Sequence, residues 1–172
     1  MEHRFISEIN ANGRRLEGYA AKFGSEARIA DFTEVILAGA FADTLRGDRD
    51  VLALVDHDPK TLLARTKSGT LELREDDQGL AFGLTVPDTQ AGHDVLALAD
   101  RGDLGGMSFG FTVANDGERW SGRRRELRAV DLHEISVVSA WPAYADTEVN
   151  ARTMTPRLNL AFRFLESCEW EY

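Results

Sequence analysis

The sequence predicts a mostly β protein, a barrel or sandwich with one or two short helices. Short stretches of strand character recur along the chain, and turn signals built from Asn, Asp and Gly separate them. Before the C-terminal tail, two stretches have helical features. The chain has 172 residues, of which 43% are hydrophobic and 28% charged, a composition typical of one soluble globular domain.

The N-terminal part is expected to begin with a hairpin. Residues 3–10 and 14–22 have strand character and meet at Asn12-Gly13, a dipeptide that tolerates the positive φ of a tight turn. Residues 34–37 are short and β-like. The stretch 38–45 then has the apolar spacing of a short helix.

A strand is predicted at residues 51–55, an apolar run of strand length. It should end before Pro59, which has no N–H to donate and pushes the preceding residue toward extended geometry. A second hairpin is expected from residues 69–75 and 79–86, with an Asp-rich turn between them.

A helix is expected to run to about Arg101. Asp88 or Thr89 would cap its start, and Gly102 would stop it. Three further strands are predicted, at residues 106–114, 124–130 and 132–138.

Ser108 is a candidate nucleophile. Side chains alternate along a strand, so Ser108 and Gly110 should share one face, opposite Met107, Phe109 and Phe111. Glycine in a strand often marks the close approach of a ligand or another backbone, which suits attack on an extended peptide. A small residue tolerated under a neighbouring strand is the commoner role of a lone serine.

His57 is the candidate general base. It follows the predicted strand at residues 51–55 and stands between Asp56 and Asp58. A histidine at a strand end could take a serine's proton and return it to the leaving amine. From spacing alone, a solvated loop histidine, or one paired with the two aspartates, is the commoner role.

Glu134 is the candidate third member of the site. It lies among residues of strand character, where an unpaired carboxylate would be costly to bury. Orienting His57 would give this carboxylate a partner. His133, expected on the opposite face of the strand, is the alternative third member. An ion pair of Glu134 with Arg128 or Arg101 is the structural alternative.

Composition argues against several classes of partner. The chain has 29 acidic and 20 basic side chains, and its formal net charge of -9 disfavours nucleic acid. Cys168 is the only cysteine, so no intrachain disulfide is expected. Neither a signal peptide nor a membrane span is evident, which predicts a cytoplasmic protein. No metal-ligand spacing or phosphate loop is present, so no cofactor is expected.

Several short motifs, taken together, resemble those of a known protein family. They are, in chain order, Glu34-Val35-Ile36, Gly39-Ala40-Phe41, Val55-Asp56-His57-Asp58, Gly79-Leu80, Gly106-Met107-Ser108-Phe109-Gly110-Phe111, Leu132-His133-Glu134-Ile135-Ser136-Val137-Val138 and Pro142-Ala143-Tyr144. Each motif alone is weak, but the set in this order is fairly specific. From about Gly18 to about Arg152, the chain resembles the HK97-type prohead proteases of tailed phages and related prophage elements.

The resemblance implies a fold and a mechanism. That family is related in fold to the herpesvirus assembly proteases, which implies a β-barrel surrounded by short helices in an α+β protein. It implies a catalytic histidine at His57, a serine at Ser108 and a third member near Glu134. The herpesvirus enzymes use a second histidine as third member, which keeps His133 open, whereas the phage-type pattern favours Glu134.

The function expected from the resemblance is that of a serine endopeptidase. Its implied substrates are scaffold or capsid-protein extensions inside an immature procapsid in the host cell, often with self-cleavage, and a homo-oligomer is an open possibility. The main alternative is a non-catalytic capsid or tail structural protein on a related β-barrel. A second alternative is a scaffold or assembly chaperone fused to a degenerate protease. The structural-protein alternative leaves His57, Ser108 and Glu134 without a joint role.

The expected domain boundary lies where this resemblance ends. Residues 1–152 are expected to form the protease domain. Residues 153–172 are expected to form a linker and tail, which begin at Thr153-Met154-Thr155-Pro156. The tail has apolar residues at both helical and strand spacing, and it could be a self-processing region, an interaction segment or a cap on the barrel.

Overall fold

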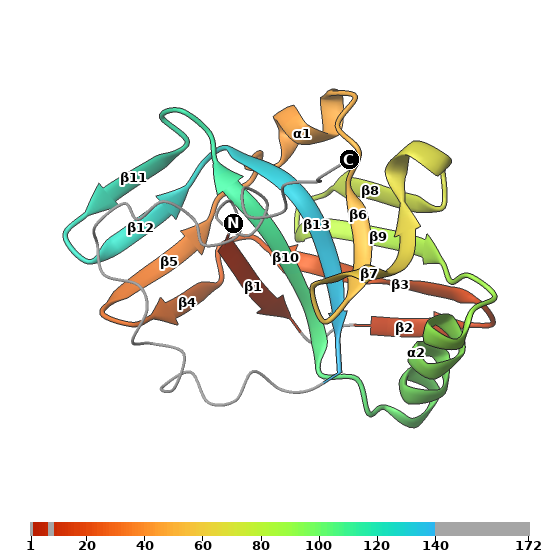
Figure 1. Cartoon of the computed structure of the whole chain (residues 1–172). Helices are drawn as coiled ribbons and strands as arrows, with labels where there is room; N and C mark the ends of the chain where they lie inside the picture. Colours follow the sequence, from red (N-terminus) through yellow and green to blue (C-terminus); the bar gives the residue numbers. More distant parts are fainter. Residues whose placement is uncertain (1, 7–8, 140–172) are drawn as a thin grey trace, which may run out of the picture.

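The computed structural model describes residues 2–6 and 9–139 (Figure 1). Within this part, the chain is mostly β. Its helices are α1 (Ala42–Arg46) and α2 (Gln90–Arg101), with one turn of 3-10 helix at Thr66–Ser68. Its strands are β1 (Glu2–Ile6), β2 (Ile9–Asn12), β3 (Arg15–Lys22), β4 (Glu26–Ile29), β5 (Phe32–Ile36), β6 (Leu52–Val55), β7 (Asp58–Arg65), β8 (Leu71–Glu75), β9 (Gly79–Thr85), β10 (Gly106–Val113), β11 (Glu118–Ser121), β12 (Arg124–Leu127) and β13 (Val130–Val138). The predicted boundary at residue 152 and the predicted tail lie outside the described residues.

The strands pair into three sheets. A five-stranded sheet has the order β1-β10-β13-β6-β7, and two four-stranded sheets have the orders β11-β12-β5-β4 and β2-β3-β9-β8. In Figure 1, β10 and β13 run through the middle of the molecule, with the β11-β12-β5-β4 sheet on one side and the β2-β3-β9-β8 sheet on the other. The prediction of a mostly β chain with a few helices is confirmed. The described strand pairs do not close into a ring, so the barrel stays a prediction.

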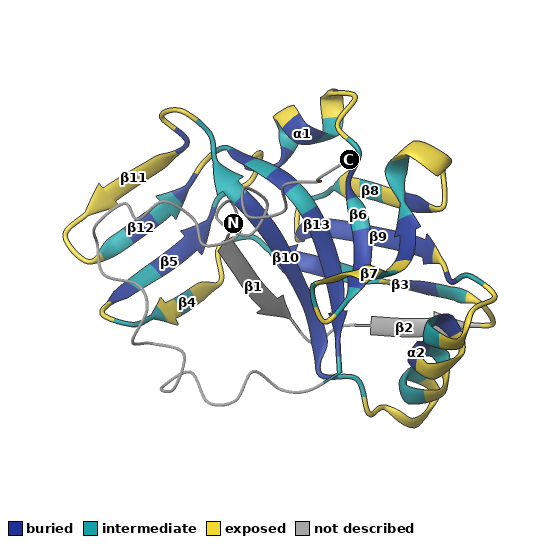
Figure 2. Ribbon diagram, in the orientation of Figure 1, coloured by how far each residue is buried: buried dark blue, intermediate teal, exposed yellow. Residues whose placement is uncertain are grey.

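The hydrophobic core lies between the five-stranded sheet and the sheet that holds β3 and β9. Three phenylalanines form its centre: the rings of Phe41 and Phe109 lie 5.6 Å apart edge to face, and those of Phe109 and Phe111 lie 5.3 Å apart and stacked. Burying each such side chain stabilises the fold by about 1.5–3 kcal/mol. Figure 2 shows that burial follows β10, β13 and β9, whereas β11 and the outer side of α2 are exposed. The core thus holds rigid the two strands that carry Ser108 and Glu134.

Local sequence signals account for the hairpins and for α2. The β2–β3 turn has Gly13 at φ 62°, and β8 and β9 pair as the second predicted hairpin. The hydroxyl of Thr89 accepts a hydrogen bond from the Gly92 amide at 3.3 Å and caps α2, which ends at Gly102 with φ 72°. These features confirm the predicted cap and stop signals.

Three strands were not expected: β4, β7 and β11. The single strand predicted at residues 3–10 is also wrong, because this stretch is divided into β1 and β2, which belong to different sheets. The predicted strand at residues 51–55 does end at Val55, as β6. However, β7 begins at Asp58 and contains Pro59. β7 is the last strand of its sheet, and an edge strand can include a residue that has no N–H to donate.

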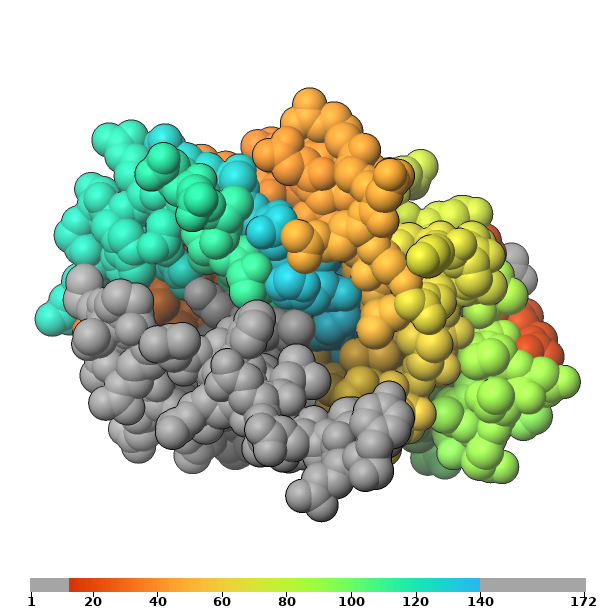
Figure 3. All heavy atoms as spheres, turned by 45° about the horizontal axis from the view of Figure 1, so that its top comes forward, coloured from red at the N-terminus to blue at the C-terminus, as the bar shows by residue number. Residues whose placement is uncertain are grey.

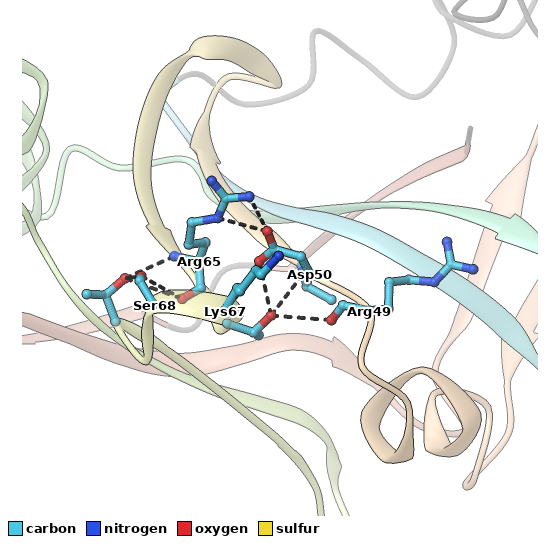
Figure 4. Close-up of polar contacts among 8 residues, drawn as sticks. Arg49, Asp50, Arg65, Lys67 and Ser68 are labelled. Carbon is cyan, nitrogen blue, oxygen red and sulfur yellow. Dashed lines mark hydrogen bonds and ion pairs between the residues drawn. The ribbon is translucent and has the colours of Figure 1, made fainter.

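Asp50 ties the segment before β6 to the segment after β7 (Figure 4). Its carboxylate accepts a hydrogen bond from Nε of Arg65 at 2.9 Å and another from the Lys67 amide at 3.1 Å. The Val51 amide donates to the Thr66 hydroxyl at 2.9 Å. The Arg65 guanidinium, followed by the Lys67 amide, holds the pKa of Asp50 below its ordinary value.

We expect Asp50→Asn to flatten the acidic side of the stability profile. A carboxylate whose pKa is lower in the folded than in the unfolded state stabilises the fold above the unfolded-state pKa. That contribution is lost as pH falls through the folded-state value. Urea unfolding between pH 7 and pH 3 would therefore show a shallower loss of stability in Asp50→Asn than in the wild type. The control is Asp77→Asn, which removes the same charge from an exposed turn; equal slopes for all three proteins would contradict the prediction.

Candidate active site

Ser108 and Glu134 lie on one face of two neighbouring strands. In the antiparallel pair β10–β13, Ser108 is opposite Ser136 and Gly110 is opposite Glu134. Directly opposed residues of a sheet point to the same side, so all four share a face. Met107, Phe109 and Phe111 are almost fully buried in the core on the other side, which confirms the predicted alternation.

The turn between β6 and β7 presents His57. Val55 pairs with Asp58, so only Asp56 and His57 make the connection, and their φ angles are 48° and 62°. Two consecutive positive φ angles are what a type I′ hairpin turn requires, and Asn-Gly is the usual occupant. Holding such angles at non-glycine residues costs on the order of 1–3 kcal/mol each, and strain of this kind is concentrated at functional sites.

Asp56 fastens this turn to the end of β13. Its amide donates to the Val137 carbonyl at 2.9 Å. Its carboxylate accepts hydrogen bonds from the amide and the hydroxyl of Ser139, both at 2.8 Å. β6 also runs parallel to β13, with Val55 opposite Val137. The turn that holds His57 is therefore fixed against the strand that holds Glu134.

His57 and Glu134 form a hydrogen-bonded pair. Nδ1 of His57 lies 2.8 Å from Oε1 of Glu134, and the Glu134 residue is only 4% exposed. An ionised carboxylate can only accept, so Nδ1 carries the proton in this pair and Nε2 is the basic nitrogen of the ring. The second carboxylate oxygen, Oε2, accepts a hydrogen bond from the Ser136 hydroxyl at 2.5 Å.

The hydroxyl of Ser108 is fully buried and has no hydrogen-bond partner in this structure, as far as the described residues show. Leaving a buried hydroxyl without a partner costs about 1–3 kcal/mol, and such groups in native proteins are often functional. Ser108 does not donate to His57 here. A hydrogen bond between them, tightened when substrate binds, stays a prediction.

A β-bulge changes the position expected for His133. Gly110 pairs with Glu134, but the next residue of β10 pairs with Leu132, which leaves His133 as the extra residue. Leu132 and Ile135 are both fully buried in the core although they are three positions apart. The two residues between them therefore lie on the same face. The prediction that His133 faces away from Glu134 is wrong, because the sequence pattern does not reveal the bulge.

His133 has its own partners, none of which is His57. Its Nε2 lies 3.0 Å from the Thr112 hydroxyl, and its Nδ1 lies 3.2 Å from Arg49, which also pairs with Asp131 at 3.2 Å. Burial, followed by the charge of Arg49, lowers the pKa of His133. In the space-filling view of Figure 3, β13 (blue) reaches the surface beside the segment that contains α1 (orange).

The ion pairs considered for Glu134 are not formed. Arg128 pairs with Glu126 at 3.3 Å, and Arg101 pairs with Asp103 at 2.8 Å. Sequence reasoning also missed Ser136, although its position two residues after Glu134 places it on the same face of a strand. The hydrogen bonds between Asp56 and Ser139 could not be predicted from the sequence pattern, because these residues are 83 positions apart.

Among residues 2–6 and 9–139, no group of three or more His, Cys, Asp or Glu side chains could hold a metal ion. No helix in this part is long and apolar enough to cross a membrane. Ser108 shares a sheet face with a buried carboxylate that contacts a histidine, and serine, histidine and carboxylate are the kinds of group with which acyl-transfer enzymes work. The β-rich fold and these groups make serine hydrolase the candidate class of protein.

Comparison with known families gives the class a name. Residues 3–159 match the family described as caudovirus prohead serine protease, and the chain belongs to this family. The resemblance found in the sequence is thereby confirmed. Neither the curated proteins nor the solved structures yield a match. The family is one of serine peptidases that act in phage capsid maturation, on capsid or scaffold proteins.

Proposed function

We propose that this chain is a serine endopeptidase with Ser108 as nucleophile, His57 as general base and Glu134 as the residue that orients His57. Family membership supports serine peptidase activity in general. The observation that carries the residue assignment is the bond between Nδ1 of His57 and buried Glu134, on the sheet face that also holds Ser108.

The reaction follows from these positions. The Oγ of Ser108 attacks the scissile carbonyl while its proton passes to Nε2 of His57. The imidazolium then gives that proton to the leaving amine, and an acyl-enzyme remains. Water gives a proton to the same nitrogen and attacks the ester, and the imidazolium returns that proton to Oγ of Ser108 as the carboxylic acid product leaves. The Glu134 carboxylate stabilises the imidazolium in both steps and keeps the ring in the required tautomer.

Glu134 is better supported than His133 as third member. Glu134 contacts His57 directly, whereas His133 contacts Thr112 and Arg49. The lowered pKa of His133 also favours a neutral ring near pH 7, and a neutral ring stabilises an imidazolium less than a carboxylate does.

For substrates, we propose scaffold or capsid-protein extensions in the immature procapsid, with self-cleavage as a second reaction. A closed barrel like that of the herpesvirus assembly proteases belongs to the same proposal. A non-catalytic structural protein is the alternative. It gives no reason for a strained turn that holds a histidine on a buried carboxylate.

A fluorophosphonate probe tests the assignment. We expect one covalent adduct per chain, located on Ser108 by mass measurement of the peptides, because only an assembled site makes a serine strongly nucleophilic. His57→Ala and the heat-denatured wild type should not react. An adduct on another serine would identify that serine as the nucleophile instead of Ser108. The absence of any adduct would favour the non-catalytic structural protein. Co-expression with the neighbouring capsid gene, followed by mass measurement of the products, would then identify the substrate.

A further inference from the structure

The buried hydroxyl of Ser136 is the second partner of the Glu134 carboxylate. Ser136 is fully buried, and its Oγ lies 2.5 Å from Oε2 of Glu134. This distance is at the short end for a hydroxyl that donates to an ionised oxygen, a bond roughly twice as strong as a neutral one. Each oxygen of the carboxylate thus has its own donor, because Oε1 accepts from His57.

Ser136 sits where its backbone has little freedom. β13 is paired on both sides, with Ser136 opposite Ser108 of β10 and opposite Leu54 of β6. Only the rotation of its own side chain moves the hydroxyl. A carboxylate held at Oε2 by such a donor cannot turn about its terminal bond without losing a buried hydrogen bond.

Ser136 and Ser108 have different environments although they are opposite each other. The Ser136 proton is directed to Glu134, whereas the Ser108 hydroxyl has no hydrogen-bond partner within the described structure. Deprotonation of Ser136 by a neighbouring base would place two negative charges side by side in a buried site, which is unfavourable. The geometry therefore separates a serine whose hydroxyl supports the carboxylate from a serine whose buried hydroxyl has no competing hydrogen bond within the described structure.

We propose that Ser136 is a positioning residue that keeps Glu134 ionised and turned toward His57. The inference rests on the proposed function. A carboxylate this deeply buried needs donors to remain charged, and a neutral Glu134 would not support the imidazolium. Ser136 acts through Glu134 and has no contact with the substrate in this assignment.

Two effects should follow when Ser136→Ala removes the hydroxyl. The rate of Ser108 labelling by a fluorophosphonate should fall about 10- to 100-fold, which corresponds to about 1.5–3 kcal/mol, the contribution of a hydrogen bond to a charged group, expressed as a change in rate. The acidic limb of the rate–pH profile should also move to higher pH, because the ionised carboxylate has lost a donor that favours its charge. Ser136→Thr, which keeps the hydroxyl, should have the labelling rate and the acidic limb of the wild type.

The matched control is Thr44→Val. Thr44 is also buried, donates to the Val130 carbonyl at 3.0 Å and accepts from the Leu132 amide at 3.0 Å, so it supports the other end of β13. Its loss should lower stability without moving the pH limb. If added bulk keeps Ser136→Thr from folding, Ser136→Cys, with a weaker donor of similar size, should give an intermediate rate.

Proton NMR gives a readout that does not depend on activity. The Nδ1 proton of His57, bonded to a buried carboxylate, should resonate far downfield in the wild type and in Thr44→Val. It should be broadened or lost in Ser136→Ala. A wild type that shows this resonance but no labelling would refute the proposed function while leaving the positioning of Glu134 intact.

The inference is overturned by any of three results. Ser136→Ala could keep the wild-type rate, pH limb and NMR resonance. It could lose labelling only in proportion to its unfolded fraction, with an unchanged limb, which would indicate a structural role. The wild-type adduct could lie on Ser136, which would make this residue the nucleophile.

Discussion

Ser108→Ala should abolish cleavage of a capsid or scaffold partner and leave the protein at least as stable as the wild type. The substitution removes the proposed nucleophile, so only the residual rate from substrate binding and oxyanion contacts remains. It also removes a fully buried hydroxyl that has no hydrogen-bond partner within the described structure. We expect a gain in unfolding free energy of about 1 kcal/mol, since an unsatisfied buried hydroxyl destabilises the fold.

Both effects can be measured on one preparation. For a chain of this size, about 1 kcal/mol raises the melting temperature by about 2–4 °C. Ser121→Ala, which truncates an exposed serine at the end of β11, should change neither cleavage nor melting. Cleavage by Ser108→Ala at near wild-type rate would remove Ser108 from the mechanism. A loss of several kcal/mol would show that the hydroxyl has a structural role instead.

Glu134→Gln should lower turnover by about 10³- to 10⁴-fold while the protein stays folded. The amide has the size of the carboxylate, but it carries no charge to stabilise the imidazolium, and its NH2 end can favour the wrong tautomer of His57. The loss should appear in kcat far more than in KM, because Glu134 acts on the reacting groups through His57 rather than on the bound substrate.

His133→Ala is the comparison that decides the third member. It removes the contacts with Thr112 and Arg49 and should affect turnover only slightly, because the carboxylate that contacts His57 is intact. If His133→Ala abolishes cleavage and Glu134→Gln does not, the third member is His133. Circular dichroism of both variants would show whether any loss of activity reflects unfolding.

Local patterns in the sequence were sufficient for much of the framework. Period-two alternation placed Ser108 and Gly110 opposite three core side chains, because neighbouring side chains of a strand point to opposite faces. The hairpin turn at Gly13 and the ends of α2 at Thr89 and Gly102 were also evident, since turns and caps depend on only a few adjacent residues.

The assembly of the site depended on contacts between distant parts of the chain. His57 meets Glu134, 77 positions away, only because β6 pairs in parallel with β13 and a strained two-residue turn ends β6. The bulge that brings His133 to the face of Glu134 depends on the register with β10. The sequence by itself determined which residues could carry the chemistry. Strand pairing decided which of them meet, because register depends on packing across the whole sheet rather than on neighbouring residues.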